Sequence, residues 1–378
     1  MRKGSRLEPK RARADKPQKR KMKKGWKIVL IVLAVLIALA LIAVGLVYAK
    51  FHSLHSAIFD DGKLTAEQEQ QVGQIVEEME TDPEVQEQQR EIEQALEQLQ
   101  EEVPEMSSTP ISTGLPDLPI KHDSNVINIL LIGTDERTQG FSNFARGDSC
   151  MILSLNKSTG RAKLVSLERG MGVPILGGQY QGQWDWLTHT FCYGGADLMM
   201  REVRECFRVD VDRYIRVNFT AFRQGIDTIG GVDITLTEAE ANYLNNRGSD
   251  VTFSAGPNHL YGWAALQYAR CRKIDSDWMR IKRQRTVIQA AINKTKNLSV
   301  GELNDLLNIL SRQVKTNLTE GEILELMSLA PRFQGVTLEQ MTIPASGTYG
   351  GMRGMGGRSL FAVDFAANAK ILQDFLYG

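Results

Sequence analysis

Residues 126–133 read VINILLIG, and two similar apolar segments follow closely, CMILSLN at 150–156 and AKLVSLE at 162–168. Their length and their β-branched content favour strands over helices. Residues 214–219 and 233–236 extend this pattern, whereas residues 196–206, 280–297 and 365–375 have the spacing of amphipathic helices. Two further helices are expected near residues 302–310 and 320–329. Strands that alternate with helices predict an α/β (α+β layered) domain with a central mixed β-sheet flanked by helices, which we assign to residues 121–378.

Upstream of this domain, residues 50–120 are rich in Glu and Gln and end in a Pro/Ser/Thr-rich stretch, which we interpret as a linker. Apolar side chains recur every three or four positions through residues 64–103, which predicts an amphipathic helix. Pro83 divides this helix, and Asp82 can cap its second half. We therefore expect a helical stalk. Val85, Ile92 and Leu99 lie in heptad-like spacing, so the stalk either self-associates or stays an isolated, solvated helix.

Farther upstream, residues 28–49 form an uninterrupted apolar run. Its length corresponds to ~33 Å of helix, which is enough to span a bilayer. Trp26 and Tyr48 lie at its ends, and residues 1–27 are strongly basic. The positive-inside rule then predicts a single-pass cell-membrane protein with a cytoplasmic N-terminal tail and an extracytoplasmic domain. A cleaved signal peptide is the alternative, although this run exceeds the usual apolar length of such peptides.

The composition of the chain sets limits on its class. Of its 378 residues, 42% are hydrophobic, and 45 basic residues balance 45 acidic ones. The apolar content excludes a wholly disordered chain, and the segregation of charge excludes a uniform soluble enzyme. Because the basic tail adjoins the predicted span, we interpret it as a contact with anionic lipid and predict no nucleic-acid partner. The four cysteines lack zinc-site spacing, so we expect small core residues, with disulfide pairing left open.

Charged residues gather where the predicted strands begin and end. Asp135 and Arg137 follow the first strand, Arg146 and Asp148 precede the second, and Arg169 follows the third. Ligands of open α/β sheets bind at such edges. The sequence has no P-loop, dinucleotide-binding glycine motif, zinc-protease motif or nucleophile elbow, so the common enzyme classes that depend on them lack support.

A second group of charged residues lies farther along the chain. Arg270 and Arg272 alternate, so in an extended segment both side chains point to one side. Arg280 and Gln284 follow Asp277 and share one face of a helix. Converging arginines bind phosphate oxygens, and aspartates bind divalent cations, so the two groups together suit a metal-dependent diphosphate site. Surface ion pairs are the alternative.

The order of these motifs resembles the LytR-CpsA-Psr family of cell-envelope proteins. The family elements occur in sequence across residues 125–300: G-x-D-x-R at 133–137, R-x-D at 146–148, S-x-x-R at 166–169, G-G-V-D at 230–233, R-x-R at 270–272, and D-x-x-R-x-x-R-Q at 277–284. The resemblance implies a phosphotransferase that moves a glycopolymer, whether teichoic acid, capsule or another wall polysaccharide, from an undecaprenyl diphosphate carrier onto peptidoglycan.

The resemblance also implies roles for these residues. It implies that Asp135 and Asp148 hold Mg²⁺ or Mn²⁺, and that Asp277 is a base or the partner of one; with Arg169 they form the catalytic set. The diphosphate would be bound by Arg137, Arg146, Arg169, Arg270, Arg272, Arg280 and Gln284. The polyprenyl chain needs an apolar tunnel, for which the helices from Ile281 and through residues 303–329 are candidates, although ordinary core packing explains their apolar residues equally well.

Two positions depart from the family pattern. Gly170 stands where the family usually has Asp, which removes a possible base or orienting group, and Trp186 lies where it often has Lys. We expect nearby His189 to serve a core or loop role. Two other functions remain open, a polyprenyl diphosphate hydrolase and a degenerate, binding-only regulatory protein. The attenuator label once given to such proteins lacks support, because residues 1–27 contain no helix-turn-helix.

Overall fold

The computed structural model describes residues 49–102, 111–135, 146–295, 314–333 and 335–378. The chain forms two units, residues 1–53 and 54–378, and the fold described below is that of the second unit. Residues 28–48 of the predicted span, Arg137 and the helix expected near 302–310 lie outside the described residues. Among the residues described, no helix combines the length and the apolar character needed to cross a membrane.

A mixed six-stranded sheet forms the centre of the fold, in the order β10-β3-β2-β1-β6-β9. Its strands are β1 (Val126–Thr134), β2 (Ser149–Asn156), β3 (Ala162–Leu167), β6 (Arg213–Asn218), β9 (Val314–Thr316) and β10 (Glu339–Ile343). β1, β2 and β3 form an antiparallel meander, whereas β6 lies parallel to β1 and β10 lies parallel to β3. The three apolar segments are therefore strands, and the predicted central mixed sheet is confirmed.

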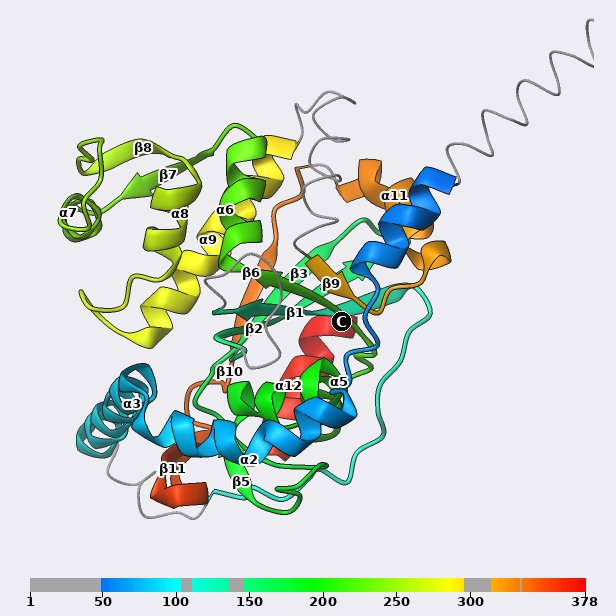
Figure 1. Ribbon diagram of the computed structural model, residues 1–378, viewed down its shortest axis with the longest axis vertical. Coiled ribbons are helices and arrows are strands. Elements are labelled where there is room, and N and C mark those ends of the chain that lie inside the picture. The colour runs from blue at the N-terminus through cyan, green and yellow to red at the C-terminus, as the bar shows by residue number, and fades with distance from the viewer. Residues whose placement is uncertain (1–48, 103–110, 136–145, 296–313, 334) are drawn as a thin grey trace, which may run out of the picture. The chain divides into compact units, whose positions relative to one another are not determined.

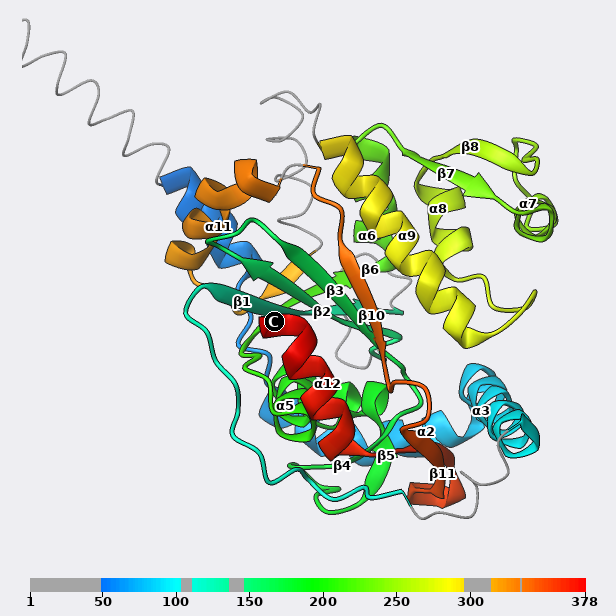
Figure 2. The same ribbon diagram turned by 180° about the vertical axis from the view of Figure 1, so that it is seen from behind.

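Helices cover both faces of the sheet (Figures 1 and 2). α5 (Thr190–Phe207) and α12 (Phe365–Tyr377) pack on one face, where Phe207 and Phe365 join the core formed by Leu130 and Ile152. α9 (Asp277–Thr295) packs on the other face through Ile288. The predicted helical layers are thus confirmed. All four cysteines are buried with free thiols, as expected for small core residues.

A second, smaller core forms from α6 (Phe219–Thr228), β7 (Val232–Leu236), α7 (Glu238–Asn245), β8 (Gly256–Leu260) and α8 (Gly262–Ala269). β7 and β8 pair as an antiparallel hairpin. Val287 of α9 is buried in this core, so α9 contacts both the sheet and the smaller core. This arrangement fixes the loop between α8 and α9, which carries Arg270 and Arg272.

The remaining elements are short. β4 (Gly172–Pro174) pairs with β5 (Trp184–Trp186), and β11 (Tyr349–Arg353) pairs with β12 (Ser359–Val363). The 3₁₀ turns η1 (Leu187–His189) and η2 (Met355–Gly357) follow β5 and β11. α11 (Glu320–Phe333) contains the helix predicted at 320–329, and its Leu324 and Met327 are exposed.

The helix predicted at residues 64–103 is present as two helices, α2 (Ala66–Thr81) and α3 (Pro83–Glu102). Thr65 forms a capping box with Gln68 at the start of α2. The carboxylate of Asp82 accepts a hydrogen bond from the backbone N–H of Glu84 at 2.7 Å, which supplies the expected cap for α3. The break falls at Pro83, where the sequence placed it.

These two helices do not stand apart from the domain as the expected stalk would. Val72, Ile75, Val76 and Met79 of α2 are buried in a cluster with Trp186, Cys192, Leu360 and Phe361. Val85 and Ile92 of α3 are buried in the same cluster, so two of the three residues expected to allow self-association contact the domain instead. The reason is physical: burying an apolar stripe against an existing core removes more apolar surface from water than leaving it solvated.

Candidate active site at one edge of the sheet

The register of the β1–β2–β3 meander brings three charged loops to one edge of the sheet. Gly133 near the end of β1 pairs with Ser149 at the start of β2, and Cys150 pairs with Leu167 at the end of β3. The loops beyond these pairs carry the predicted residues Asp135, Asp148 and Arg169. Their convergence therefore follows from strand pairing.

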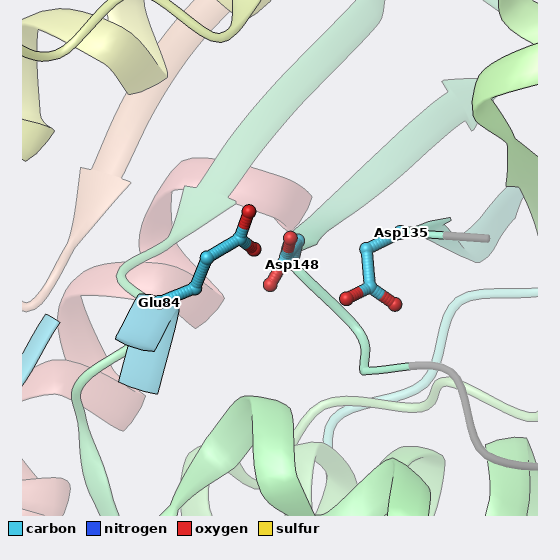
Figure 3. Close-up of side chains that lie close together, drawn as sticks. All are labelled: Glu84, Asp135 and Asp148. Carbon is cyan, nitrogen blue, oxygen red and sulfur yellow. The ribbon is translucent and has the colours of Figure 1, made fainter. Parts of the chain in front are cut away.

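Three carboxylates lie together at this edge: Asp135 after β1, Asp148 before β2 and Glu84 in the first turn of α3 (Figure 3). One oxygen of each lies within 4.8 Å of the others. Burial and the charge of Asp148 raise the pKa of Asp135 above its ordinary value, although Arg146 opposes the shift. Oxygen ligands in this arrangement suit a hard divalent cation such as Mg²⁺. The predicted aspartates thus fit a metal, and Glu84 is a third candidate ligand that the sequence analysis missed.

Arg146 links these carboxylates to one another. Its backbone N–H donates to Oδ1 of Asp135 at 3.0 Å, and its Nη2 lies 2.8 Å from Oδ2 of the same residue. Nη2 also lies 2.9 Å from Glu84, and Nη1 lies 3.1 Å from Asp82. One guanidinium group therefore joins the end of β1 to the start of α3.

A second charged cluster surrounds Asp277, the first residue of α9. Nη2 of Arg169 lies 3.4 Å from Asp277 and 2.9 Å from Glu91, and Nε of Arg280 lies 2.9 Å from Asp277. Although burial favours the neutral acid, Arg169 and Arg280 hold the pKa of Asp277 below its ordinary value. A carboxylate paired in this way is a poor proton acceptor. Asp277 is therefore better suited to orienting the two arginines than to acting as a base.

Glu168 is a further member of this cluster, outside the predicted set. It is 2% exposed and lines a pocket together with Arg169, Arg272 and Asp277. Burial and the neighbouring charge of Asp277 raise the pKa of Glu168 to about 8, so it holds a proton at neutral pH. Its position directly before Arg169 was the available sequence signal, but a single sequence does not reveal depth of burial.

Arg270 and Arg272 lie at the same edge, but their local conformation differs from the prediction. They do not form an extended segment, because α8 continues to Ala269 and Arg270 keeps helical backbone angles at its C-cap. Nε of Arg272 lies 3.3 Å from Glu91, and the guanidinium of Arg270 lies 4.5 Å from the ring centroid of Phe219. Helix termination, rather than strand alternation, therefore positions these two side chains.

Gln284 is also at this edge, on the face of α9 that carries Arg280. Its Oε1 accepts a hydrogen bond from the hydroxyl of Ser149 at 3.1 Å, which joins α9 to the start of β2. Of the predicted site residues, the structure thus brings together Asp135, Asp148, Arg146, Arg169, Arg270, Arg272, Asp277, Arg280 and Gln284. Glu84, Glu91 and Glu168 were missed.

The two departures from the family pattern also have structural explanations. Trp186 is buried, and its Nε1–H donates to the backbone oxygen of Ser359 at 2.9 Å. His189 is buried and its Nδ1 lies 3.1 Å from the carboxylate of Asp185, which fits the expected core role. At Gly170, an added Cβ would lie 2.4 Å from Cδ1 of Ile92, so α3 occupies the space that a side chain there would need.

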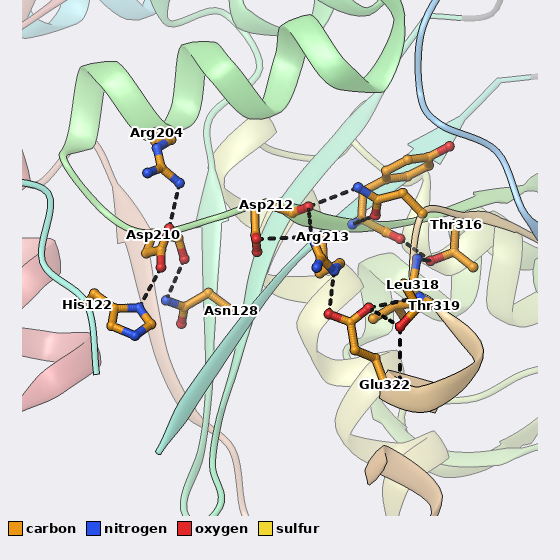
Figure 4. A network of polar contacts seen from close by, with 12 residues as sticks. His122, Asn128, Arg204, Asp210, Asp212, Arg213, Thr316, Leu318, Thr319 and Glu322 are labelled. Atoms are coloured by element: carbon orange, nitrogen blue, oxygen red, sulfur yellow. Dashed lines mark hydrogen bonds and ion pairs between the residues drawn. The ribbon is translucent and has the colours of Figure 1, made fainter. Parts of the chain in front are cut away.

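Charged residues away from this edge form structural contacts instead. Arg204 of α5 pairs with Asp210 at 2.5 Å, and Asp210 also bonds His122 at 2.6 Å (Figure 4). Arg213 at the start of β6 lies 2.7 Å from Glu322 of α11. These contacts tie loops and helices to the other end of the sheet.

Comparison with known proteins places this geometry in context. Among curated proteins, the chain is 34% identical over 206 residues to the polyisoprenyl-teichoic acid–peptidoglycan teichoic acid transferase TagU of Bacillus mycoides (strain KBAB4). The alignment covers 54% of this chain and 64% of TagU, so the chain spans less than two thirds of that relative's length.

Similar solved structures share the fold over a larger part of the chain. TagT bound to LIIa-WTA superposes with a TM-score of 0.54 and 26% identity, covering 72% of this chain and 98% of that one. The LytR-CPS2A-psr family protein YwtF (TagT) with bound octaprenyl pyrophosphate lipid gives a TM-score of 0.51 and 25% identity, covering 71% and 100%. The family model itself matches residues 65–374, from the start of α2 into α12. The chain therefore belongs to the LytR_cpsA_psr family.

Proposed function

We propose that this protein is a membrane-anchored phosphotransferase that attaches a glycopolymer from an undecaprenyl diphosphate carrier to peptidoglycan. The observation that carries the proposal is the convergence of the Asp135–Asp148 carboxylates with Arg146, Arg169 and Arg272 at one sheet edge. The similar TagT structures hold LIIa-WTA and octaprenyl pyrophosphate, and the similar TagU is named as a teichoic acid transferase. These relatives support a teichoic acid as the transferred polymer.

The arginines would bind the diphosphate. Arg169 and Arg280 are almost fully buried, and both are held by Asp277, so their guanidinium groups are oriented before a ligand arrives. Arg272 is less buried and Arg270 is still more open, which suits side chains at the entrance of the site. Gln284 would add a hydrogen-bond donor, and Arg137 completes the proposed set from sequence.

Asp135 and Asp148 would hold Mg²⁺ or Mn²⁺, with Glu84 within reach of the same ion. When bound, the cation would neutralise negative charge on the diphosphate and on the leaving phosphate. Burial, together with the charge of Asp148, raises the pKa of Asp135, and a bound cation would favour the ionised form of both carboxylates.

The transfer itself would join a peptidoglycan hydroxyl oxygen to the phosphorus that carries the glycopolymer. The bond from that phosphorus to the bridging oxygen breaks, the bridging oxygen leaves with polyprenyl phosphate, and the hydroxyl proton passes to the leaving phosphate. The arginines stabilise the charge that develops on the phosphoryl oxygens. Asp277 pairs with both Arg169 and Arg280, and protonated Glu168 lines the pocket beside Arg169.

The predicted span at residues 28–49 would hold this site beside the outer face of the cell membrane. Tethering raises the effective concentration of a lipid-linked substrate around the site. We therefore propose that the protein is a single-pass membrane protein, with peptidoglycan and the lipid-linked glycopolymer as its partners.

The proposal is tested by transfer of a labelled lipid-linked teichoic acid in the presence and absence of peptidoglycan. We expect label on peptidoglycan with the wild-type chain and none with the Asp135→Asn, Asp148→Asn double variant, while Arg201→Ala keeps full transfer. Arg201 is a suitable control because it lies on α5 and, within the described residues, pairs with Asp197 alone, in an exposed contact. Release of the polymer into solution regardless of peptidoglycan would instead identify a hydrolase.

A further inference from the structure

α3 lies directly over the arginines of the site and presents acidic side chains to them. Glu91 contacts Arg169 at 2.9 Å and Arg272 at 3.3 Å. Two helical turns earlier, Glu84 contacts Arg146 at 2.9 Å and lies 3.8 Å from Arg270. Carboxylates of α3 thus form ion pairs with the same guanidinium groups that a diphosphate would need to bind.

The surface beneath α3 is shaped to receive it. Ile92, the residue after Glu91, is 3% exposed and fills the space above Gly170, where a Cβ would lie only 2.4 Å from its Cδ1. Leu96, one turn on, lies over Gly351, where a Cβ would lie 3.3 Å from its Cδ1. The absence of a side chain at Gly170 therefore permits α3 to dock at this depth.

α2 and α3 are held to the domain in different ways. α2 buries four apolar side chains, whereas α3 buries Val85 and Ile92, packs Ala95 and Leu96 partly buried on the same cluster, and adds polar contacts through Glu and Gln. The helices meet at Asp82, whose backbone is extended, followed by Pro83, which has no N–H to donate. Any movement of α3 relative to α2 would therefore bend the chain at this junction.

Between α3 and the arginines lies a pocket lined by Gln88, Glu91, Arg169, Arg272 and Asp277, among others. Gln88 is 5% exposed, and its Nε2 has no hydrogen-bond partner within the described part of the chain. A buried amide donor without a partner costs free energy, so the docked position of α3 includes an unfavourable contribution from Gln88.

We propose that α3 is a built-in acidic cap that competes with the substrate diphosphate for the arginines, so that substrate binding requires α3 to withdraw. This inference rests on the proposed function. In the capped state, Glu91 occupies Arg169 and Arg272, and Glu84 occupies Arg146. A polyprenyl diphosphate displaces these carboxylates, so that Glu84 leaves any bound cation to Asp135 and Asp148, and Ile92 leaves the surface at Gly170.

The decisive experiment is titration of the full chain, in mild detergent and MgCl₂, with geranyl diphosphate as a soluble probe. Glu91→Gln removes the competing charge with almost no change in shape, so it should bind the probe about tenfold more tightly than wild type. Glu97→Gln is the matched control, because it makes the same charge change at an exposed position of α3 and should leave affinity unchanged. Equal affinity of wild type and Glu91→Gln would overturn the cap.

Hydrogen exchange provides a second, independent readout. Adding the probe should increase exchange along residues 85–99 of α3 and leave residues 72–79 of α2 unchanged. If α3 becomes more protected instead, it forms a wall of the substrate site and does not compete with the substrate. Gly170→Ala should likewise increase exchange in α3. Adding Ile92→Val to that variant removes the atom nearest the new Cβ and should restore the protection of α3.

The two proposals fail in different ways. If neither wild type nor Glu91→Gln binds the probe, and Arg272→Ala makes no difference, the proposed diphosphate site is wrong. If the probe binds and Arg272→Ala weakens it while Glu91→Gln has no effect, the site is right and the cap is wrong.

Discussion

The raised pKa of Glu168 makes the stability of the domain depend on pH, and Glu168→Gln should remove that dependence. The amide fills nearly the same volume and can donate to Asp277 as the protonated acid does, but it does not titrate. In the folded chain the pKa of Glu168 rises from 4.5 to about 8. The folded state therefore keeps a proton that the unfolded state releases above pH 4.5, and stability declines as the pH rises toward 8.

The magnitude follows from the linkage slope, about 1.4 kcal/mol per pH unit for one proton. Between pH 5.5 and 7.5 wild type should lose about 3 kcal/mol relative to Glu168→Gln, as an order-of-magnitude value for a buried carboxyl. Asp277 does not contribute in this range, because its lowered pKa affects stability only below its ordinary value of 3.8. Asp135 and Glu202, whose pKa values are also raised, act equally in both proteins and cancel in the difference.

Urea unfolding of the full chain in mild detergent, followed by tryptophan fluorescence at several pH values, measures this difference. The exposed Glu97→Gln variant should follow wild type at every pH. If the free energies of unfolding of wild type and Glu168→Gln change in parallel from pH 5.5 to 7.5, the conclusion that folded Glu168 holds a proton in this range is refuted.

Two further predictions test the arginines and the topology. Arg272→Ala should weaken geranyl diphosphate binding about 10- to 100-fold, because each charge-assisted hydrogen bond contributes about 1.5–3 kcal/mol, and Arg270→Ala should have a smaller effect because Arg270 is more exposed. Arg272→Lys should restore only part of the lost affinity, since an ammonium group cannot reproduce the bidentate fork. If titration shows that Arg201→Ala loses as much affinity as Arg272→Ala, the predicted site arginines are ordinary surface ion pairs. Protease added to intact protoplasts should remove residues beyond about 50, and protection of the domain would contradict the topology predicted from residues 1–49.

The central strands could be predicted because their signal is local. β1, β2 and β3 are rich in β-branched residues and follow one another in the chain. Asp135, Asp148 and Arg169 lie next to the ends of these strands in the sequence, so finding the strands also located these residues. The edge strands could not be found in this way: β9 has three residues, and β10 joins β3 only through pairing between distant parts of the chain. The extended conformation expected for Arg270 and Arg272 was wrong because the apolar α8 carries its helical geometry through Arg270.

The position of α3 could not be predicted for a different reason. Its Glu and Gln residues have the composition of a solvated face, and that is the usual environment of such residues. Here Glu84 and Glu91 meet Arg146, Arg169 and Arg272, which belong to β-strand loops and to the α8–α9 loop. A single sequence shows these acidic and basic residues but does not show that they are in contact in the folded chain. Glu168 was missed likewise, because its character depends on burial.

The position of α12 has a consequence for how the domain is made. The β1–β2–β3 meander needs only contacts between neighbouring segments, so it can form early during synthesis. α5 covers part of its core face, but the rest stays open until Phe365 and Leu372 arrive with α12, and β10 must also join β3. Until then the nascent domain exposes a hydrophobic sheet and an unpaired strand edge, the features that recruit chaperones and favour aggregation. Folding of this domain is therefore completed only after α12 has been synthesised.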